Sequence, residues 1–384
     1  MKKFFYAGLI GLLVFEFLNV YLIMPMPGSQ TTNSIDIAYF FYKYRWLIRT
    51  ILVIFILAGS AAVFRNRRKW LPATALLLIV AIGYLMNFKM SADKMFLQAK
   101  KIELKPQQEN KLAGNRLVIG IEHNGEAKAY PISLLAYHHQ VRDSIGGKPV
   151  MVTYCSVCRT GRVFEPIVNG HYENFRLVGM DHFNAMFEDA ATKSWWRQST
   201  GEAIAGTLKG NVLPEMVSRQ MTVDKWFDLY PQGKIMQPDE AFITSYDSLA
   251  RFEQGKSKGS LTRTDTVAWK NKSWIVGIQV GNSATAYDWN DLKKKSIIHD
   301  TIGQKALVLI VSSDGQSFAA YERPVNKFFT LKHDTLFSDD AAYNFSGRDL
   351  ANPSNKLRPI QAYQEFWHSW TAFHPNTRQY LADK

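Results

Sequence analysis

Two cysteines, Cys155 and Cys158, are the only ones among 384 residues, and they follow an apolar segment that runs from Val150 to Tyr154. Two sulfurs at the C-x-x-C spacing can bind one metal ion, exchange with a partner disulfide, or close into a structural disulfide. A loop of about four residues makes a weak structural link, since the chain-entropy model assigns it only about 2 kcal/mol. The spacing therefore favours a metal-binding or thiol-redox centre.

A metal ion at this pair needs further ligands, because a closed zinc site takes four and the sequence has no second C-x-x-C. His182 and Met180 are the best candidates, since they lie in a short polar segment downstream of the pair. Soft sulfur ligands with one imidazole suit copper better than zinc. We therefore expect copper or zinc at Cys155, Cys158, His182 and Met180. Covalent haem is excluded, because Arg159 stands where C-x-x-C-H requires histidine, and no nucleotide cofactor is expected.

Other chemistries stay open at the same residues. Thiol exchange would use both cysteines, although the residues after Cys158 predict a turn and a strand rather than the helix N-terminus of a thioredoxin site. A cysteine hydrolase or transferase would use Cys155 as nucleophile, His182 as base and Asn184 as orienting group, with Glu202 as a further acid or base. A binding module with a purely structural disulfide is the last alternative. The sequence therefore does not decide whether the protein is an enzyme.

Short segments rich in β-branched and aromatic residues surround the cysteines, and turn dipeptides such as Asn-Gly and Gly-Gly separate them, as is typical of strands. Two short helices are predicted, from Pro131 to Tyr137 and from Thr222 to Tyr230, with Thr222 as the N-cap. Trp195 and Trp196 are adjacent, so we expect one indole in the core and the other in a cleft or solvent. The predicted strands are Leu117 to Ile121, Ala127 to Tyr130, Val150 to Tyr154, Arg162 to Glu165 and Tyr172 to Val178.

Two stretches of the chain after residue 95 are similar to each other. Residues 119–148 and 276–305 share 10 identities in 30 positions at a constant offset of 157, which indicates a duplicated unit. At this offset Cys155 falls on Ser312 and Cys158 on Gly315, so only one half carries the thiols. We expect a β-rich α+β fold of two pseudo-symmetric repeated units after three transmembrane helices. The expected domains are 1–95 (anchor), 96–252 (half with the C-x-x-C site), 253–264 (linker) and 265–384 (degenerate half).

Three apolar runs at the N-terminus are each long enough to cross a membrane: Phe4 to Met24, Trp46 to Phe64 and Trp70 to Asn87. Six basic residues lie at the N-terminus and in the loop between the second and third runs, which would be on the same side of the membrane. The positive-inside rule puts that side in the cytoplasm. We therefore expect a bacterial inner membrane protein whose C-terminal domain lies on the periplasmic, extracytoplasmic side. Within the runs, Arg49 is expected to extend to the interface. A pair with Glu16 is the alternative, and an ion path is disfavoured.

The formal net charge of +13 mostly reflects this topology. Residues 1–95 hold 11 Lys and Arg against 3 Asp and Glu, a net of +8, and the rest of the chain is only mildly basic. No run of basic residues interleaved with aromatics occurs there, so nucleic acid is not an expected partner. The membrane is the one partner that the sequence predicts, and a protein partner or a small-molecule substrate cannot be named.

At these motifs the chain resembles an uncharacterised bacterial family, domain of unknown function 3179, over about residues 100–380. The family's T-Y-C-x-x-C-x-[ST]-[AG] pattern is matched from Thr153 to Gly161, and its downstream Asn by Asn184. Its Ser-x-Trp-x-Gln is matched from Ser194 to Gln198, and its Gly-Glu-Ala-Ile from Gly201 to Ile204. Members commonly have Gly after the second Cys, where this chain has Arg159, and Gly suits the positive φ of a metal-binding turn. The resemblance implies export and a shared site, and it implies no particular activity.

Overall fold

The structure is a computed structural model that describes residues 1–65, 67–247 and 249–381. The chain forms two compact units, which we call the anchor unit and the core unit. The anchor unit comprises residues 1–97, 173–197 and 202–212. The core unit comprises residues 98–172, 198–201 and 213–384. The expected fold class, α+β with many strands after three apolar helices, is confirmed at this level.

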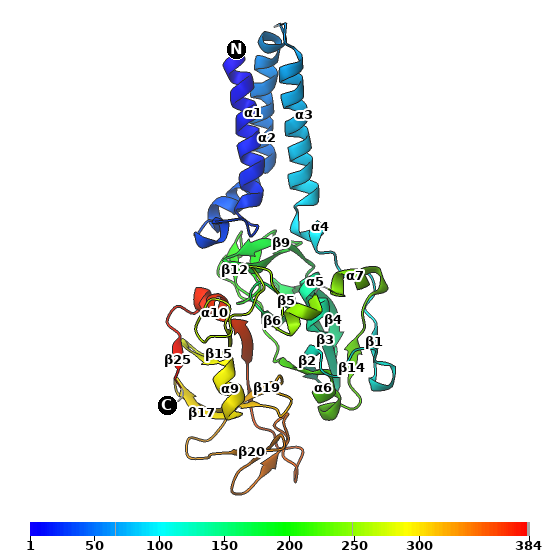
Figure 1. Ribbon diagram of the computed structural model, residues 1–384, viewed down its shortest axis with the longest axis vertical. Helices are drawn as coiled ribbons and strands as arrows, with labels where there is room; N and C mark the ends of the chain where they lie inside the picture. Colours follow the sequence, from blue (N-terminus) through cyan, green and yellow to red (C-terminus); the bar gives the residue numbers. More distant parts are fainter. Residues whose placement is uncertain (66, 248, 382–384) are drawn as a thin grey trace. The chain divides into compact units, whose positions relative to one another are not determined.

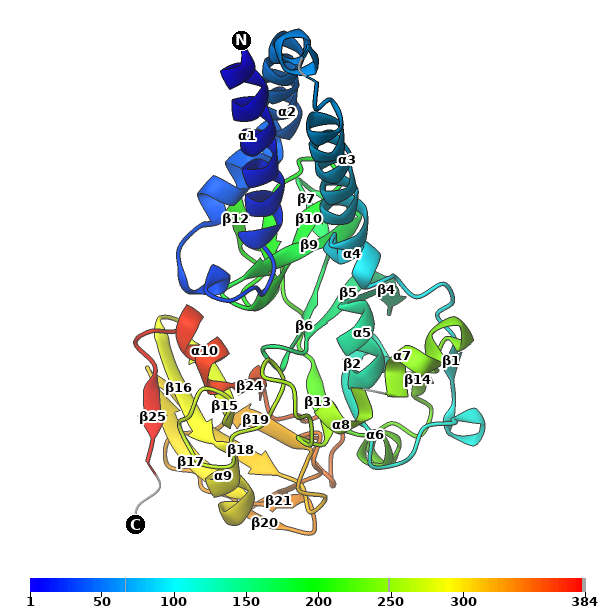
Figure 2. The same ribbon diagram turned by 45° about the horizontal axis from the view of Figure 1, so that its top comes forward.

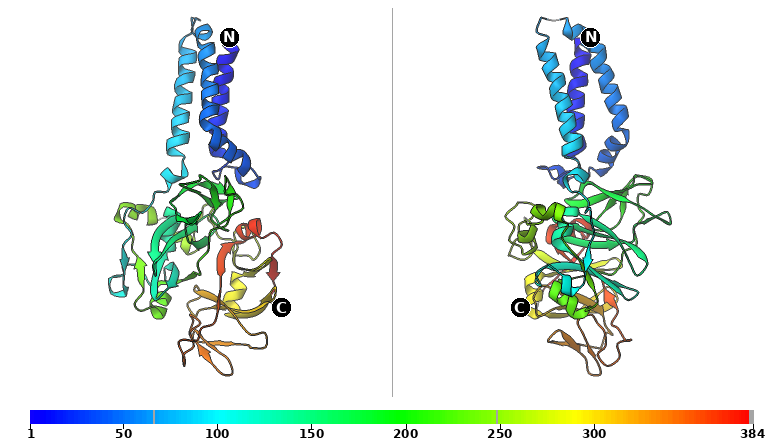
Figure 3. Two further views of the ribbon diagram at one scale, coloured as in Figure 1. Left: turned by 180° about the vertical axis from the view of Figure 1, so that it is seen from behind. Right: turned by 90° about the vertical axis from the view of Figure 1, so that its right-hand side faces the viewer.

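The anchor unit begins with three long apolar helices, α1 (Lys2–Tyr21), α2 (Ile35–Phe64) and α3 (Trp70–Tyr84), and α3 continues into a π-helical turn, η2 (Leu85–Lys89). They lie side by side in Figure 1, and both views of Figure 3 agree. All three are long and apolar enough to cross a membrane, as the sequence predicted. Helices α1 and α2 approach closely at glycines. A Cβ atom on Gly8 would lie only 2.6 Å from the carbonyl oxygen of Leu52.

A polar network joins the three helices inside this apolar bundle. Arg49 Nε and Nη2 donate to the two carboxylate oxygens of Glu16 at 2.7 and 2.8 Å. The side-chain amide of Asn87 accepts from Arg49 and donates to Glu16, both at 2.7 Å. The prediction that Arg49 extends to the interface was wrong, and the alternative pair with Glu16 is what forms. A guanidinium that can satisfy its charge inside the bundle has no need to reach water.

The anchor unit also holds a four-stranded antiparallel sheet, built by β9 (Phe175–Asp181), β10 (Asn184–Asp189), β11 (Trp195–Arg197) and β12 (Ala203–Ala205). Its apolar face packs against the N-terminal end of α2, where Ala38 joins Val178 and Trp195 in one buried cluster. This packing explains why α2 begins at Ile35, well before the apolar run that starts at Trp46. Two short elements complete the anchor unit. In the sequence, η1 (Ser29–Thr31) lies between α1 and α2, and α4 (Ala92–Met95) follows η2.

The two adjacent tryptophans are both buried in this sheet, with 1% and 3% exposure for Trp195 and Trp196. The expectation that one indole faces a cleft or solvent was therefore wrong. The Trp195 indole N–H donates to Glu188 at 3.1 Å and that of Trp196 donates to Asp189 at 2.9 Å. Carboxylates within the sheet thus satisfy both polar ends, which allows burial on either side of the strand.

The core unit contains two sets of strands in the same order. The first has β2 (Leu117–His123), β3 (Glu126–Pro131), α5 (Ile132–His138), β4 (Gln140–Ile145), β5 (Lys148–Cys155) and β6 (Thr160–Phe164). The second, visible in Figure 2, has β15 (Trp274–Val280), β16 (Ser283–Asp288), α9 (Trp289–Lys295), β17 (Ile297–Ile302), β18 (Lys305–Val311) and β19 (Phe318–Glu322). The first residues of β2 and β15 are 157 positions apart, as are those of β3 and β16.

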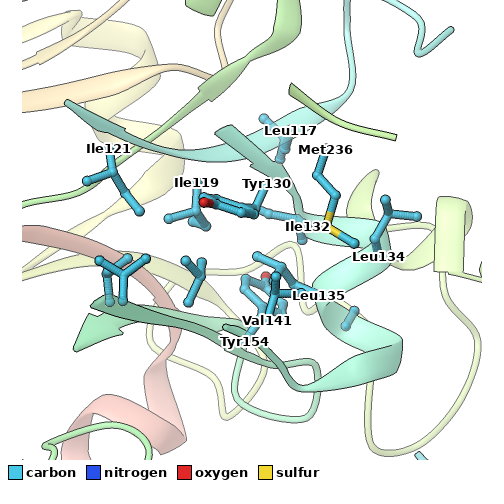
Figure 4. Packing of buried hydrophobic residues seen from close by; sticks show 14 of the residues in the cluster. Leu117, Ile119, Ile121, Tyr130, Ile132, Leu134, Leu135, Val141, Tyr154 and Met236 are labelled. Carbon is cyan, nitrogen blue, oxygen red and sulfur yellow. The ribbon is translucent and has the colours of Figure 1, made fainter. Parts of the chain in front are cut away.

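Equivalent contacts accompany the shared order. The Tyr130 hydroxyl donates to Asp143 at 2.7 Å, and the Tyr287 hydroxyl donates to Asp300 at the same distance. Each set has its own apolar core. Figure 4 shows part of the first core, where Ile119 and Tyr130 face side chains that include Val141 and Tyr154. Both sets therefore place a tyrosine–aspartate hydrogen bond beside an apolar core.

Some sheets in the core unit join strands that are far apart in the sequence. The sheets run in the orders β1-β14-β3-β2-β13, β4-β5-β6, β24-β15-β16-β25, β17-β18-β19-β23, β20-β21-β22 and β7-β8. Glu253, the first residue of the predicted linker, is buried and pairs with Arg116 at 2.7 Å, and the linker itself stays a prediction. The remaining elements are β1 (Leu104–Lys105), η3 (Gln107–Glu109), β7 (Ile167–Val168), β8 (His171–Tyr172), β13 (Arg219–Thr222), α6 (Val223–Leu229), β14 (Lys234–Met236), η4 (Glu240–Phe242), α7 (Ile243–Asp247), α8 (Leu249–Glu253), β20 (Thr330–Lys332), β21 (Thr335–Phe337), β22 (Ala342–Tyr343), β23 (Pro359–Ile360), β24 (Ala362–Phe366), α10 (Trp367–Phe373) and β25 (Arg378–Tyr380).

The predicted N-cap of α6 is confirmed, since Thr222 Oγ1 accepts from the backbone N–H of Lys225 at 3.1 Å. The same hydroxyl donates to Asp314 at 2.9 Å. Replacing Thr222 by Ala should therefore lower the free energy of unfolding by about 1–2 kcal/mol, because both partners lose a hydrogen bond. Chemical denaturation of the detergent-solubilised protein measures this, and Thr222→Ser, which keeps the hydroxyl, should stay close to the wild type.

Candidate functional site

Both cysteines lie at the tip of the β5–β6 hairpin in the core unit. Cys155 ends β5, where it pairs with Thr160 of β6, and Cys158 lies in the four-residue turn between them. The turn between two strands is the arrangement that the sequence predicted. The structure contains the two residues as cysteines rather than as a disulfide, and both side chains have 0% exposure. The pair is thus a closed site in this conformation.

Arg159 has a left-handed backbone in this turn, with a φ of +59°. This left-handed conformation costs a non-glycine residue about 1–2 kcal/mol. Side-chain contacts offset the cost: the guanidinium lies 3.4 Å from the centroid of the Trp274 ring and donates to Gln364 at 3.0 Å. It also donates to the carbonyl of Glu253 at 3.0 Å. These contacts of the side chain with residues outside the turn allow an arginine at the position where family members commonly have glycine.

Lys272 is a cation that interacts with the turn holding the two cysteines. Its ammonium donates to the carbonyl of Val157, between the two cysteines, at 2.8 Å and to the carbonyl of Leu261 at 2.6 Å. Burial lowers the pKa of Lys272 to about 8, while Cys158 and Cys155 act to raise it. Coupling of this sign means that thiolates and the ammonium favour each other's charged forms. The two cysteines thus hold the pKa of Lys272 above the value that burial alone would give.

β24 and the residues after it cover the same turn. The backbone N–H of Phe366 donates to the carbonyl of Cys158 at 2.9 Å, and the Lys272 ammonium lies 4.6 Å from the centroid of the Phe366 ring. Two residues further, His368 Nδ1 lies 2.9 Å from the carbonyl oxygen of Asn271. Burial and the charge of Lys272 lower the pKa of His368 to about 4. The imidazole is therefore neutral at physiological pH, and Lys272 supplies the positive charge.

The glutamine of the Ser-x-Trp-x-Gln motif holds the two strands of the hairpin. The Gln198 amide donates to Thr153 Oγ1 and to the carbonyl of Thr160, both at 3.0 Å. The Arg162 guanidinium lies behind it, where it donates to the carbonyl of Ser199 at 2.8 Å and pairs with Glu365 at 2.7 Å. Gln198 and Arg162 are thus positioning residues for the hairpin.

The other predicted site residues belong to the anchor unit. His182 lies at the tip of the β9–β10 hairpin, flanked by Met180 in β9 and Asn184 in β10, and Glu202 precedes β12. His182 and Glu202 line a cavity of about 210 Å³ together with Asp181. The further lining residues are Asn33, Ile35, Asp36, Arg197, Ile204 and Lys209. Cys155 and Cys158 belong to the core unit and Met180, His182, Asn184 and Glu202 to the anchor unit, so their common site stays a prediction.

Asp181 is the centre of the charges in that cavity. Its carboxylate accepts from Arg197 Nε at 2.7 Å and lies 2.6 Å from His182 Nδ1. Arg197 also pairs with Glu202 at 3.2 Å. Burial acts to raise the pKa of Asp181, but the hydrogen bonds from His182 and Arg197 lower it overall. The hydrogen bond to Asp181 raises the pKa of His182.

The tip itself is strained. His182 and Phe183 both have positive φ, +50° and +66°, as a two-residue hairpin turn of the I′ type requires. Asn-Gly is the usual choice there, and a bulky residue costs about 1–2 kcal/mol at each position. The backbone N–H of Phe183 donates to the side chain of Gln30 at 3.2 Å, which holds the tip in the anchor unit.

The raised pKa of His182 predicts a pH dependence of stability. Its favourable contribution is fully present below the unfolded pKa of about 6.5 and disappears as the pH rises through the higher folded value. We expect at most about 1 kcal/mol, because the side chain is partly exposed. Unfolding measured at pH 6 and pH 8 should show this loss in the wild type and not in His182→Asn, which keeps a residue suited to positive φ.

No group of three or more His, Cys, Asp and Glu side chains that could hold a metal ion occurs among residues 1–65, 67–247 and 249–381. Copper or zinc at Cys155, Cys158, His182 and Met180 therefore stays a prediction. The hydrolase assignment also stays a prediction. Lys272 was not predicted, because nothing in its local sequence distinguishes it from a surface lysine.

Residues 100–377 match a family described as "Protein of unknown function (DUF3179)", as the motifs around the cysteines indicated. No curated protein and no solved structure matches the chain. The match covers both sets of strands in the core unit and the sheet of the anchor unit, and it leaves out the three apolar helices. The chain belongs to this family of proteins of unknown function.

Proposed function

We propose that the protein is a membrane-anchored thiol oxidoreductase whose redox centre is the Cys155–Cys158 pair. The observation that carries the proposal is the buried ammonium of Lys272 on the carbonyl of Val157, between the two cysteines. A cation beside a thiol stabilises the thiolate, which is the reactive form. The same cation opposes the binding of a second positive charge, so the site suits thiolate chemistry better than metal binding.

The reaction partner is proposed to be a low-molecular-weight disulfide. One Cys thiolate attacks a sulfur of that disulfide, which forms a mixed disulfide and releases the first thiol of the partner. The second Cys thiolate then attacks the protein sulfur of the mixed disulfide and releases the second thiol. One S–S bond forms between Cys155 and Cys158, one breaks in the partner, and two electrons pass to the partner. The two protons of the cysteine thiols end on the two thiols released. Because both cysteines are fully buried, a small molecule fits this role better than a protein disulfide.

Location supports the proposal. The basic residues at the N-terminus and in the loop between the second and third helices favour the core unit outside the cytoplasm, where disulfide chemistry is permitted. We also propose that the two sets of strands descend from one duplicated unit, supported by the shared offset of β2 and β15 and of β3 and β16. In the second set, Ser312 and Gly315 stand at the cysteine positions, so the second copy supports the fold without redox chemistry of its own.

The test is a redox titration of the full chain in detergent. The protein is equilibrated in buffers of reduced and oxidised glutathione, quenched with an alkylating reagent, and analysed by mass. We expect a two-electron transition to an intramolecular disulfide, and a mixed disulfide with glutathione in Cys155→Ser or Cys158→Ser. Thiols that stay alkylatable across all buffers, after unfolding in the quench, would overturn the proposal.

Metal binding is the second candidate, and the positive φ of Arg159 favours it, because C-x-x-C knuckles use that conformation after the second cysteine. Elemental analysis of the same reduced preparation decides between the two. About one copper or zinc per chain, lost in Cys158→Ser, would support the metal site. A metal-free protein with a mid-range redox potential would support the thiol centre.

A further inference from the structure

We propose that the core unit carries a second, separate site, a pocket that binds a phosphate or a phosphate monoester through Arg219, Arg348 and Lys356. The pocket has a volume of about 150 Å³ and lies where β2, β13 and α6 meet the segment 346–359. Its lining also includes Glu122, Trp226 and Tyr230. None of these residues belongs to the thiol centre or to the cavity of the anchor unit.

Arg219 is the first reason for expecting an anion. Its guanidinium donates to the Tyr230 hydroxyl at 3.0 Å and to the carbonyl of Ser346 at 3.4 Å, and both partners are neutral. The carboxylate of Glu122 acts on Arg219 through its charge, but its ion pair at 3.1 Å is with Arg348. A largely buried cation whose hydrogen-bond partners are all neutral is costly, and an anion bound in the pocket would lower that cost.

The charge balance of the pocket is the second reason. Arg348 Nη2 lies 3.1 Å and Lys356 Nζ 3.7 Å from the same oxygen of Glu122. One carboxylate therefore serves two cations, and with Arg219 the pocket has three positive groups and one negative group. A net of +2 around a cavity of this size matches a phosphate, which carries between one and two negative charges at neutral pH.

The backbone holds these cations in place before any ligand arrives. Arg348 and Lys356 face each other across an isolated β-bridge. The Asn344 side chain accepts from the backbone N–H groups of Ser346 and Arg348 at 3.1 and 3.0 Å, which fixes the turn. Gly120 allows the Trp226 ring to form the floor, because a Cβ atom there would overlap the ring. The arginines offer planar donor pairs that match the oxygens of a phosphate.

The experiment follows the thermal unfolding of the full chain in detergent during titration with inorganic phosphate, at constant ionic strength maintained with chloride. We expect a saturable rise of the midpoint for the wild type and for Lys332→Met, an exposed lysine outside the pocket. Arg219→Met and Arg348→Met should each weaken the apparent affinity at least tenfold. Arg348 is partly exposed, so its variant tests the site even if Arg219→Met fails to fold.

Comparing inorganic phosphate with glycerol 3-phosphate shows whether the natural ligand is the free ion or a phosphate monoester. A tighter response to glycerol 3-phosphate than to inorganic phosphate supports a monoester as the natural ligand, and an equal or weaker response supports the inorganic ion. A non-saturable rise, or one that is unchanged in both arginine variants, means a general salt effect and overturns the proposal. A tighter response to acetate than to phosphate overturns the assignment of the ligand class.

Discussion

Replacing Glu16 by leucine should lower the stability of the anchor unit by about 3–5 kcal/mol. The substitution leaves the guanidinium of Arg49 without its carboxylate among apolar helices, and a single surviving member of a buried pair is far more costly than the pair itself. Asn87 can retain its hydrogen bond to Arg49, but a neutral amide cannot balance the charge. Unfolding of the full chain in mixed micelles with increasing SDS, followed by circular dichroism, measures the loss.

The double variant Glu16→Leu with Arg49→Leu provides the decisive comparison. It removes both charges, so most of the lost stability should return. Phe17→Leu changes an exposed apolar neighbour on α1 and should leave stability close to that of the wild type. If the single and double variants were equally destabilised, the contribution of Glu16 would be packing rather than charge, and the proposed role of the network would be wrong.

Replacing Lys272 by methionine should slow the reaction of the cysteine pair with a small alkylating reagent at pH 7 by about tenfold or more. A neighbouring opposite charge typically lowers a pKa by about 1–3 units, and removal of the ammonium reverses this shift for the thiols. The rate is measured as a function of pH, and its midpoint should move upward in the variant. Lys270→Met, an exposed lysine two residues away, is the matched control.

The same lysine predicts how stability changes at alkaline pH. Because burial lowers the folded pKa of Lys272 to about 8, the folded protein releases this proton at a lower pH than the unfolded chain, whose lysine titrates near 10.4. The unfolded state therefore binds more protons between these values, and the lysine's contribution makes the wild type more stable as the pH rises from 8 to 10.

The free energy of unfolding of the wild type minus that of Lys272→Met should therefore increase from pH 8 to pH 10. Using the variant as reference cancels the tyrosines and other lysines that titrate nearby. A difference that stays constant from pH 8 to pH 10 would mean that Lys272 keeps an ordinary pKa. The proposal that Lys272 stabilises the cysteine thiolates would then be wrong.

Local patterns in the sequence predicted most of the elements that carry these sites. The three apolar helices, the strand before Cys155, the helix after Pro131 and the Thr222 cap are confirmed. Each depends on residues within one or two turns of each other, so short-range periodicity and capping are sufficient to identify it.

Features that depend on distant partners were not predictable in this way. The Val157 carbonyl that binds Lys272 is 115 positions away in sequence. Glu16 is 33 positions from Arg49, and their pair was predicted only as the alternative to an Arg49 side chain at the interface. Likewise, Trp196 is buried because Asp189 reaches its indole N–H. A charged or amphipathic side chain is assigned to the surface by default, and only the fold shows which of them is neutralised inside.

The contacts between α2 and strands β9–β12 have a practical consequence for anyone dividing the protein. Ala38, with Ile23, Ile35, Tyr39 and Tyr42 around it, covers the apolar side chains of Val178, Met186, Trp195 and Ile204. A secreted fragment that starts near residue 96 would leave those four side chains bare. We expect such a fragment to aggregate, whereas one that retains residues 22–45 on a soluble linker should remain monodisperse in size-exclusion chromatography.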